Sequence, residues 1–68
     1  MKTEPRKYCG RFEWTSSLVK DGRLFVGVSD TAEDAERQLG KALADPTANG
    51  SAYFSRPAEL NELLDHAN

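Results

Sequence analysis

The segment WTSSLVKDGRLFVGVS, residues 14–29, decides the fold because it holds two runs of strand-forming residues around a turn. Over residues 8–19, apolar and aromatic residues alternate with polar ones, which is the period of a strand with one buried face. Lys20-Asp21-Gly22 supplies the turn, and residues 23–29 have the β-branched and aromatic content of a second strand. The segment therefore predicts a β-hairpin.

Two registers of this hairpin are open, and they differ in which side chains share a face. A two-residue loop of Asp21-Gly22 pairs Val19 with Leu24 and turns Leu24 away from the face of Trp14. A three-residue loop, with Gly22 left-handed in a bulge, pairs Leu18 with Leu24 and gathers the large residues on one face. Because a one-residue slip exchanges the two faces of a strand, burial favours the second register. We predict the three-residue loop.

A helix is predicted directly after the hairpin. Its start has capping-box spacing twice, in the pairs Asp30/Glu33 and Thr31/Asp34. Its apolar stripe is narrow and rich in alanine, so we expect the helix to lie close to a sheet, and close backbone packing is a reason for Gly40 inside it. The stripe consists of Ala32, Ala35, Leu39, Ala42 and Leu43.

The rest of the chain predicts a short strand and a second helix. Asp45-Pro46 ends the first helix, since the residue before a proline disfavours helical angles. A turn then leads to a third strand over residues 51–55. Pro57 suits the first turn of the second helix, with Ser55 or Arg56 near its cap. The apolar stripe of this helix is Leu60, Leu63, Leu64 and Ala67.

The element order β-β-α-β-α predicts a single α+β domain over residues 1–68, with residues 1–7 frayed. A right-handed crossover through the first helix makes the third strand parallel to the second and antiparallel to the first. We therefore expect a three-stranded antiparallel or mixed sheet in the strand order 3-1-2, with the helices packed on one face. The second strand is then an exposed edge, so a monomer and a weak homodimer both remain open.

Length and composition limit the class of protein. The chain has 68 residues, and 38% of them are hydrophobic, but many of these are alanine. Only one small core fits that composition. The single Cys cannot form a disulfide within the chain. Residues 1–7 contain no apolar segment of the kind that a secretory signal needs, and no apolar run is long enough to cross a bilayer. We expect a cytoplasmic protein without membrane contact.

The reactive side chains do not form a catalytic or metal-binding pattern. Cys9 has no histidine near it in the sequence that would activate its thiol. His66 lies in the last turn of the second predicted helix, where the helix dipole favours it, and a metal ion would need further ligands. We therefore expect no enzymatic activity, no cofactor and no metal.

Charge is divided unevenly along a chain whose net charge is −2. Residues 1–25 contain six Lys and Arg against three Asp and Glu, whereas residues 26–68 contain three against eight. The dense acidic group at the start of the first helix either complements the helix dipole or binds the basic groove of a partner, as DNA does. Its members, which we predict to bind a partner protein, are Asp30, Glu33, Asp34 and Glu36.

The basic N-terminal part of the chain also has two interpretations. Arg6, Lys7 and Arg11 lie among Tyr8, Phe12 and Trp14, and basic residues interleaved with aromatic ones bind nucleic acids in some proteins. Here the aromatic residues share the parity of the core face, which favours a structural role. We expect no direct contact with nucleic acid.

Two resemblances to known families follow from these motifs. The run Gly27-Val28-Ser29-Asp30-Thr31-Ala32-Glu33-Asp34-Ala35 resembles the strand-to-helix passage of HicB-type antitoxins, which implies a helix on a sheet and a toxin partner. Phe12-Glu13-Trp14, followed by residues 20–27 and an alanine-spaced helix, is similar to small phage anti-CRISPR proteins of the type I class. That second resemblance implies a non-enzymatic inhibitor of a CRISPR surveillance complex. We take the inhibitor, acting through its acidic surface, as the first hypothesis and the antitoxin or a small nucleic-acid-associated regulator as the alternative.

Overall fold

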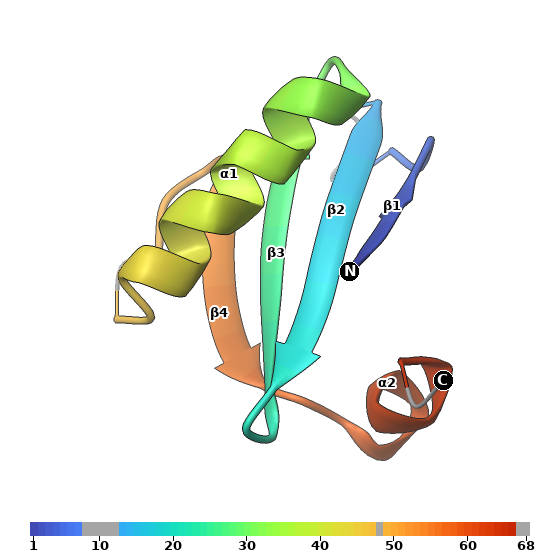
Figure 1. Cartoon of the computed structure of the whole chain (residues 1–68), viewed down its shortest axis with the longest axis vertical. Helices are drawn as coiled ribbons and strands as arrows, with labels where there is room; N and C mark the ends of the chain where they lie inside the picture. The colour runs from blue at the N-terminus through green and yellow to red at the C-terminus, as the bar shows by residue number, and fades with distance from the viewer. Residues whose placement is uncertain (8–12, 48, 67–68) are drawn as a thin grey trace.

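The computed structural model describes residues 1–7, 13–47 and 49–66, which form a four-stranded antiparallel sheet and two helices (Figure 1). The strands follow one another in the sheet in chain order, β1-β2-β3-β4. The predicted α+β class is confirmed, with one strand more than expected. The elements are β1 (Lys2–Glu4), β2 (Trp14–Lys20), β3 (Arg23–Ser29), α1 (Ala32–Ala44), β4 (Tyr53–Pro57) and α2 (Leu60–Asp65).

The additional strand is β1, which lies where a frayed terminus was expected. Lys2 pairs with Ser17, and Glu4 pairs with Thr15. The hydroxyl groups of Thr3 and Ser16 are 2.9 Å apart, and Ser16 is completely buried. The N-terminal segment is ordered because it pairs with the open edge of β2 and supplies a partner for that buried hydroxyl. The predicted start of the first strand, residues 8–12, lies outside the described residues.

The hairpin between β2 and β3 turns through two residues, so the predicted three-residue loop is wrong. Lys20 pairs with Arg23, and Asp21 and Gly22 have φ values of 53° and 76°. Left-handed angles at both central residues are those of a type I′ turn, whose twist matches the twist of the strands. The burial argument failed because it assumed one buried face, whereas five consecutive residues of β3 are buried on both faces.

The core lies on both sides of β3. On one face the buried residues Leu24, Val26 and Val28 form a cluster, and on the other Phe25 packs against Leu39 of α1. Half-buried side chains from β2, from β4 and the residue after it, and from α1 complete both layers. They are Val19, Phe54 and Ala58 on the first face, and Leu18, Leu43 and Tyr53 on the second.

The strand order 3-1-2 is wrong, because β4 pairs with β3 and is antiparallel to it. Figure 1 shows the reason: the connection after α1 returns the chain to the end of the sheet where α1 begins, so β4 runs in the direction of α1. The crossover rule applies only when a helix leads directly into a parallel strand. β3 is therefore an interior strand, and the edges of the sheet are β1 and β4.

The predicted position of α1 is confirmed. Thr31 is its N-cap, and the Thr31 hydroxyl accepts a hydrogen bond of 3.2 Å from the backbone N–H of Asp34. The stripe residues Ala35, Leu39 and Ala42 are buried against the sheet. Of the two capping pairs that the sequence allowed, the structure therefore uses Thr31 and Asp34.

α1 approaches the sheet at Gly27. A Cβ atom on Gly27 would lie 2.1 Å from the backbone nitrogen of Leu39 and 2.5 Å from the carbonyl oxygen of Ala35. Gly40, to which close packing was assigned, is exposed and has no neighbouring atom within 4 Å of its Cβ position. The close contact between the backbones is therefore made by the glycine of the strand.

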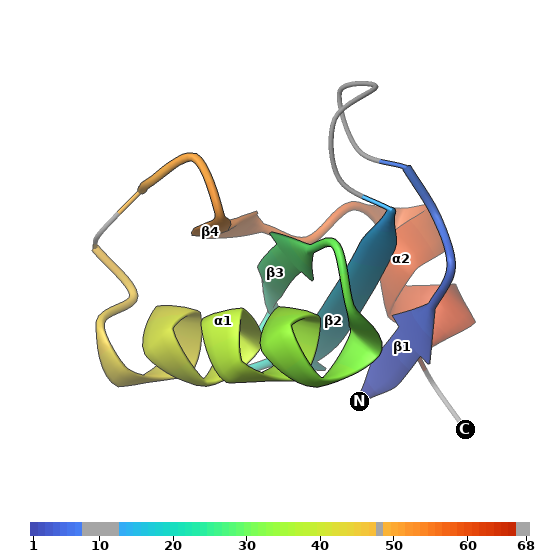
Figure 2. The same ribbon diagram turned by 90° about the horizontal axis from the view of Figure 1, so that it is seen from above.

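α2 begins later than predicted and lies on the other face of the sheet. Pro57 ends β4, and the helix starts at Leu60 after Glu59, whose side chain forms a capping box with Glu62. Figure 2 shows α1 along one face of the sheet and α2 on the other side, next to β1 and β2. The expectation of two helices on one face is wrong, because polar side chains of α2 and its C-cap His66 bond to Lys2, Ser17 and Arg56 on the face opposite α1.

Candidate protein-binding surfaces

The first surface is the acidic start of α1, which we call the acidic turn: Asp30, Glu33, Asp34 and Glu36. Asp34 is half-buried, and its Oδ1 lies 2.7 Å from Nη1 of Arg37. The other three carboxylates are exposed, and none of them has an ion pair within the described residues. The structure thus brings the four predicted site residues together, with three of them facing solvent.

The acidic turn is suited to electrostatic recognition of a partner. Its carboxylates lie on an exposed helix start, where the N-terminal dipole stabilises negative charge. The negative charge is densest at this end of α1, because Arg37 and Lys41 follow on exposed positions of the helix and Asp45 is the only acidic residue at its other end. α1 packs closely on β3 at Gly27, so Glu33, Asp34 and Glu36 keep the spacing of the helix, and Asp30 directly precedes its N-cap Thr31.

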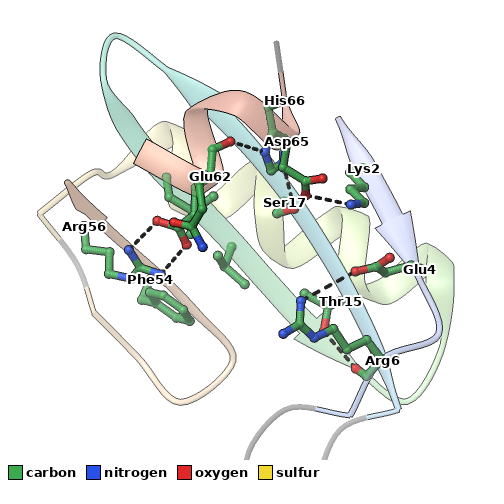
Figure 3. A pocket seen from close by; sticks show the side chains of 13 residues that line it. Lys2, Glu4, Arg6, Thr15, Ser17, Phe54, Arg56, Glu62, Asp65 and His66 are labelled. Carbon is green, nitrogen blue, oxygen red and sulfur yellow. Dashed lines mark hydrogen bonds and ion pairs between the residues drawn. The ribbon is translucent and has the colours of Figure 1, made fainter. Parts of the chain in front are cut away.

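The second surface belongs to α2, whose polar side faces the sheet. Nη1 of Arg56 in β4 donates a hydrogen bond of 2.7 Å to Oε1 of Glu62, and Nζ of Lys2 in β1 lies 2.7 Å from Oδ2 of Asp65. Nδ1 of His66 donates to the carbonyl of Glu62 at 2.9 Å, while its Nε2 lies 3.2 Å from the hydroxyl of Ser17. Figure 3 shows these contacts, which tie α2 to three strands.

Ion pairing changes the proton affinity of the groups that hold α2. The Arg56 guanidinium, hydrogen-bonded to Glu62, lowers the pKa of that carboxyl, and the backbone N–H of Glu59 adds to the effect. The hydrogen bond between Lys2 and Asp65 lowers the pKa of Asp65 and raises the pKa of Lys2. Each group is therefore held in its charged form over a wider pH range than in the unfolded chain.

The opposite side of α2 is apolar and exposed, which overturns its predicted place in the core. Leu60, Leu63 and Leu64 are 72%, 40% and 66% exposed, and α2 contributes no buried residue. We call these three residues the leucine face. The sequence also contained a polar stripe that competes with the leucines for the sheet. Glu62, Asp65 and His66 have the same i, i+3, i+4 spacing on the opposite side of the helix.

A hollow of about 450 Å³ lies between α2 and the sheet (Figure 3). Leu24, Val26 and Phe54 contribute apolar side chains to its lining. Charges line it in matched pairs: besides the two pairs that hold α2, Nη1 of Arg6 lies 3.8 Å from Oε1 of Glu4. No uncompensated Lys, Arg, Asp or Glu charge remains among the described lining residues to select a charged ligand.

The other predicted features are dispersed. Lys7 is exposed, and Trp14 is half-buried at the start of β2. Cys9 and Arg11 lie outside the described residues. Within the described ranges no group of three or more His, Cys, Asp or Glu is arranged to hold a metal ion. Among the helices of those same ranges, none has the length and apolarity needed to cross a bilayer.

Comparison with known proteins adds no relative. Neither protein-family models, nor curated proteins, nor solved structures match this chain. The class that the fold and surfaces define is therefore a small α+β protein, with a four-stranded antiparallel sheet and two exposed helical surfaces of different chemistry.

Proposed function

We propose that the protein is a non-catalytic inhibitor that binds another protein and occupies its surface, in the manner of the type I anti-CRISPR proteins that it resembles. The observation that carries the proposal is the acidic turn, where Asp30, Glu33 and Glu36 are exposed and without ion pairs in the described structure. Carboxylates at the start of a helix that is packed on the sheet present spaced negative charge to a basic groove, as nucleic-acid phosphates do. The partner is then a nucleic-acid-binding protein, such as a subunit of a CRISPR surveillance complex.

Binding to a purified type I surveillance complex tests this function. We expect the triple variant Asp30→Asn, Glu33→Gln and Glu36→Gln to bind about tenfold more weakly, mainly through slower association, and to depend less on salt. Asp45→Asn is the matched control, because it removes an exposed carboxylate at the other end of α1. Equal affinity of the triple variant and the wild type would exclude the acidic turn as the contact.

A HicB-like antitoxin is the second candidate, and the passage from β3 into α1 favours it. β3 ends at Ser29, Thr31 caps the helix, and α1 then lies on the sheet, which is the arrangement that the resemblance implies. This candidate predicts a stable complex with a purified toxin of that class. The related alternative, a small nucleic-acid-associated regulator, predicts that the protein binds duplex DNA in a salt-dependent way. This binding should weaken when Arg6 and Lys7 are changed to Ala. Without either complex, the candidate is eliminated.

A further inference from the structure

The leucine face is the largest exposed apolar feature of α2, and its exposure follows from how the helix is attached. Leu60, Leu63 and Leu64 share one side of a single helical stretch, since residues three and four apart are neighbours on a helix. The opposite side is fixed by Glu62 to Arg56 and by Asp65 to Lys2. The helix cannot turn its leucines towards the sheet without breaking both ion pairs.

The attachment also keeps α2 in one orientation before any partner binds. Its contacts reach β1 at one edge of the sheet, β2, and β4 at the other edge, and the capping box of Glu59 and Glu62 fixes its first turn. Preorganisation of this kind lowers the entropy lost on binding. A helix that presents leucines at this spacing is the recognition element of helix-in-groove complexes.

We infer that the leucine face docks into an apolar groove, with a Lys or Arg at its rim, on the partner protein; this inference rests on the proposed function and names the chemistry of its partner. The charge of the residues next to the leucines indicates which charge the rim of the partner's groove should have. Residues 59–65 contain Glu59, Glu62 and Asp65 and no Lys or Arg. Glu62 and Asp65 are already paired with Arg56 and Lys2, whereas Glu59 is exposed and has no ion pair within the described residues, so a cation on the partner complements it.

A second copy of this chain fits the leucine face poorly. A helix of six residues offers only three leucines. The area that two such helices bury against each other is far below the roughly 1,200 Å² of a stable interface. Pairing of two such helices would also bring like charges together. Addition of a second copy to the β4 edge is obstructed as well, because Gly50 N–H donates to the Tyr53 carbonyl at 2.9 Å and Ser55 N–H donates to Asn49 Oδ1 at 3.3 Å.

The test compares Leu60→Ser/Leu64→Ser with the wild type in binding to the purified surveillance complex. We expect the double variant to bind at least about 30-fold more weakly, as for residues at the centre of an interface. Its melting temperature should stay close to that of the wild type, because both side chains are exposed. Unchanged affinity overturns the inference, as does unfolding of the variant, which would show that the leucines belong to the core.

Failure of the proposed function leaves a distinct result. If the wild type does not bind the surveillance complex, proteins retained from host lysate by the wild type and lost by the leucine variant are identified, purified and recombined with it. A reconstituted one-to-one complex that depends on Leu60 and Leu64, and whose partner has the basic-rimmed groove, supports the inference without the proposed function. Failure to reconstitute any leucine-dependent complex overturns it. So does a concentration-dependent homodimer in sedimentation that Leu60→Ser/Leu64→Ser dissolves.

Discussion

At Gly27 the absence of a side chain determines how closely α1 approaches the sheet. Its Cβ position lies within 2.6 Å of three backbone atoms of α1, and backbone atoms cannot move aside as a flexible side chain does. Gly40 is the natural comparison, because it lies in the same helix–sheet unit and faces open solvent. The two glycines therefore have opposite effects on stability.

We predict that Gly27→Ala lowers the free energy of unfolding by about 3 kcal/mol, because α1 must shift away from β3 and lose core contacts. Gly40→Ala should instead raise it by up to about 1 kcal/mol, since alanine favours the helix and meets no atom there. Urea unfolding of both variants measures the difference. Equal stability of the two variants would contradict the close contact between β3 and α1.

At the scale of elements, α2 shows how two stripes on one helix compete for the sheet. The leucine stripe offers apolar area, whereas Glu62 and Asp65 offer charges whose partners are placed on two strands. The polar stripe faces the sheet because the folded sheet places Lys2 of β1 beside Asp65 and Arg56 of β4 beside Glu62. Attachment through exposed ion pairs makes this element sensitive to pH and salt.

We predict that α2 is attached at neutral pH and detaches in acid. The pKa values of Glu62 and Asp65 are lowered from the usual 4.5 and 3.8, so their contribution is complete above those values and is lost as the pH falls through the lowered ones. The pKa of Lys2 is raised from 10.5, so its contribution is complete below 10.5 and is lost as the pH rises through the raised value. The side-chain methyl chemical shifts of Leu63 and Leu64 across pH 2–12 report both transitions.

Charge-neutral variants provide the control for this titration. Glu62→Gln and Asp65→Asn together should leave α2 detached at every pH, and high salt should weaken the attachment of the wild type. A wild-type helix whose shifts stay constant down to pH 2 would show that the ion pairs do not hold it.

At the scale of the whole molecule, the hydrophobic core does not include the outer helix α2. All buried apolar residues of the described chain lie in β3 and α1, and β2 and β4 pack around them. The sheet ends at a three-residue strand on one side and, on the other, at β4, whose outer groups bond to Gly50 and Asn49. Short or capped edges of this kind limit pairing with other chains.

We predict that a chain ending after Glu59 keeps its fold. It loses two ion pairs and the contacts of His66, but no buried side chain, so its free energy of unfolding should fall by at most about 2 kcal/mol. Circular dichroism and urea unfolding measure this, with Gly27→Ala as a variant in which the core is damaged. Loss of the cooperative transition on truncation would place α2 in the core.

Local patterns predicted much of the fold. The hairpin, the position of α1 with its alanine stripe and its end at Asp45-Pro46, and the overall α+β class follow from short-range periodicity and capping, which act within a few residues. The composition of the acidic turn is equally local. The exposed carboxylates could therefore be named as a candidate surface without the structure.

The tertiary structure alone decided the register at Asp21-Gly22, the strand order, the pairing of β1 and the side on which α2 lies. Each depends on groups far apart in the chain: burial of both faces of β3, the return of the chain to β4, and ion pairs from α2 to Lys2 and Arg56. Periodicity shows that a helix has an apolar stripe, but not whether the sheet will instead bind its polar one. For that reason the leucines of α2 looked like core in the sequence and became a surface in the folded protein.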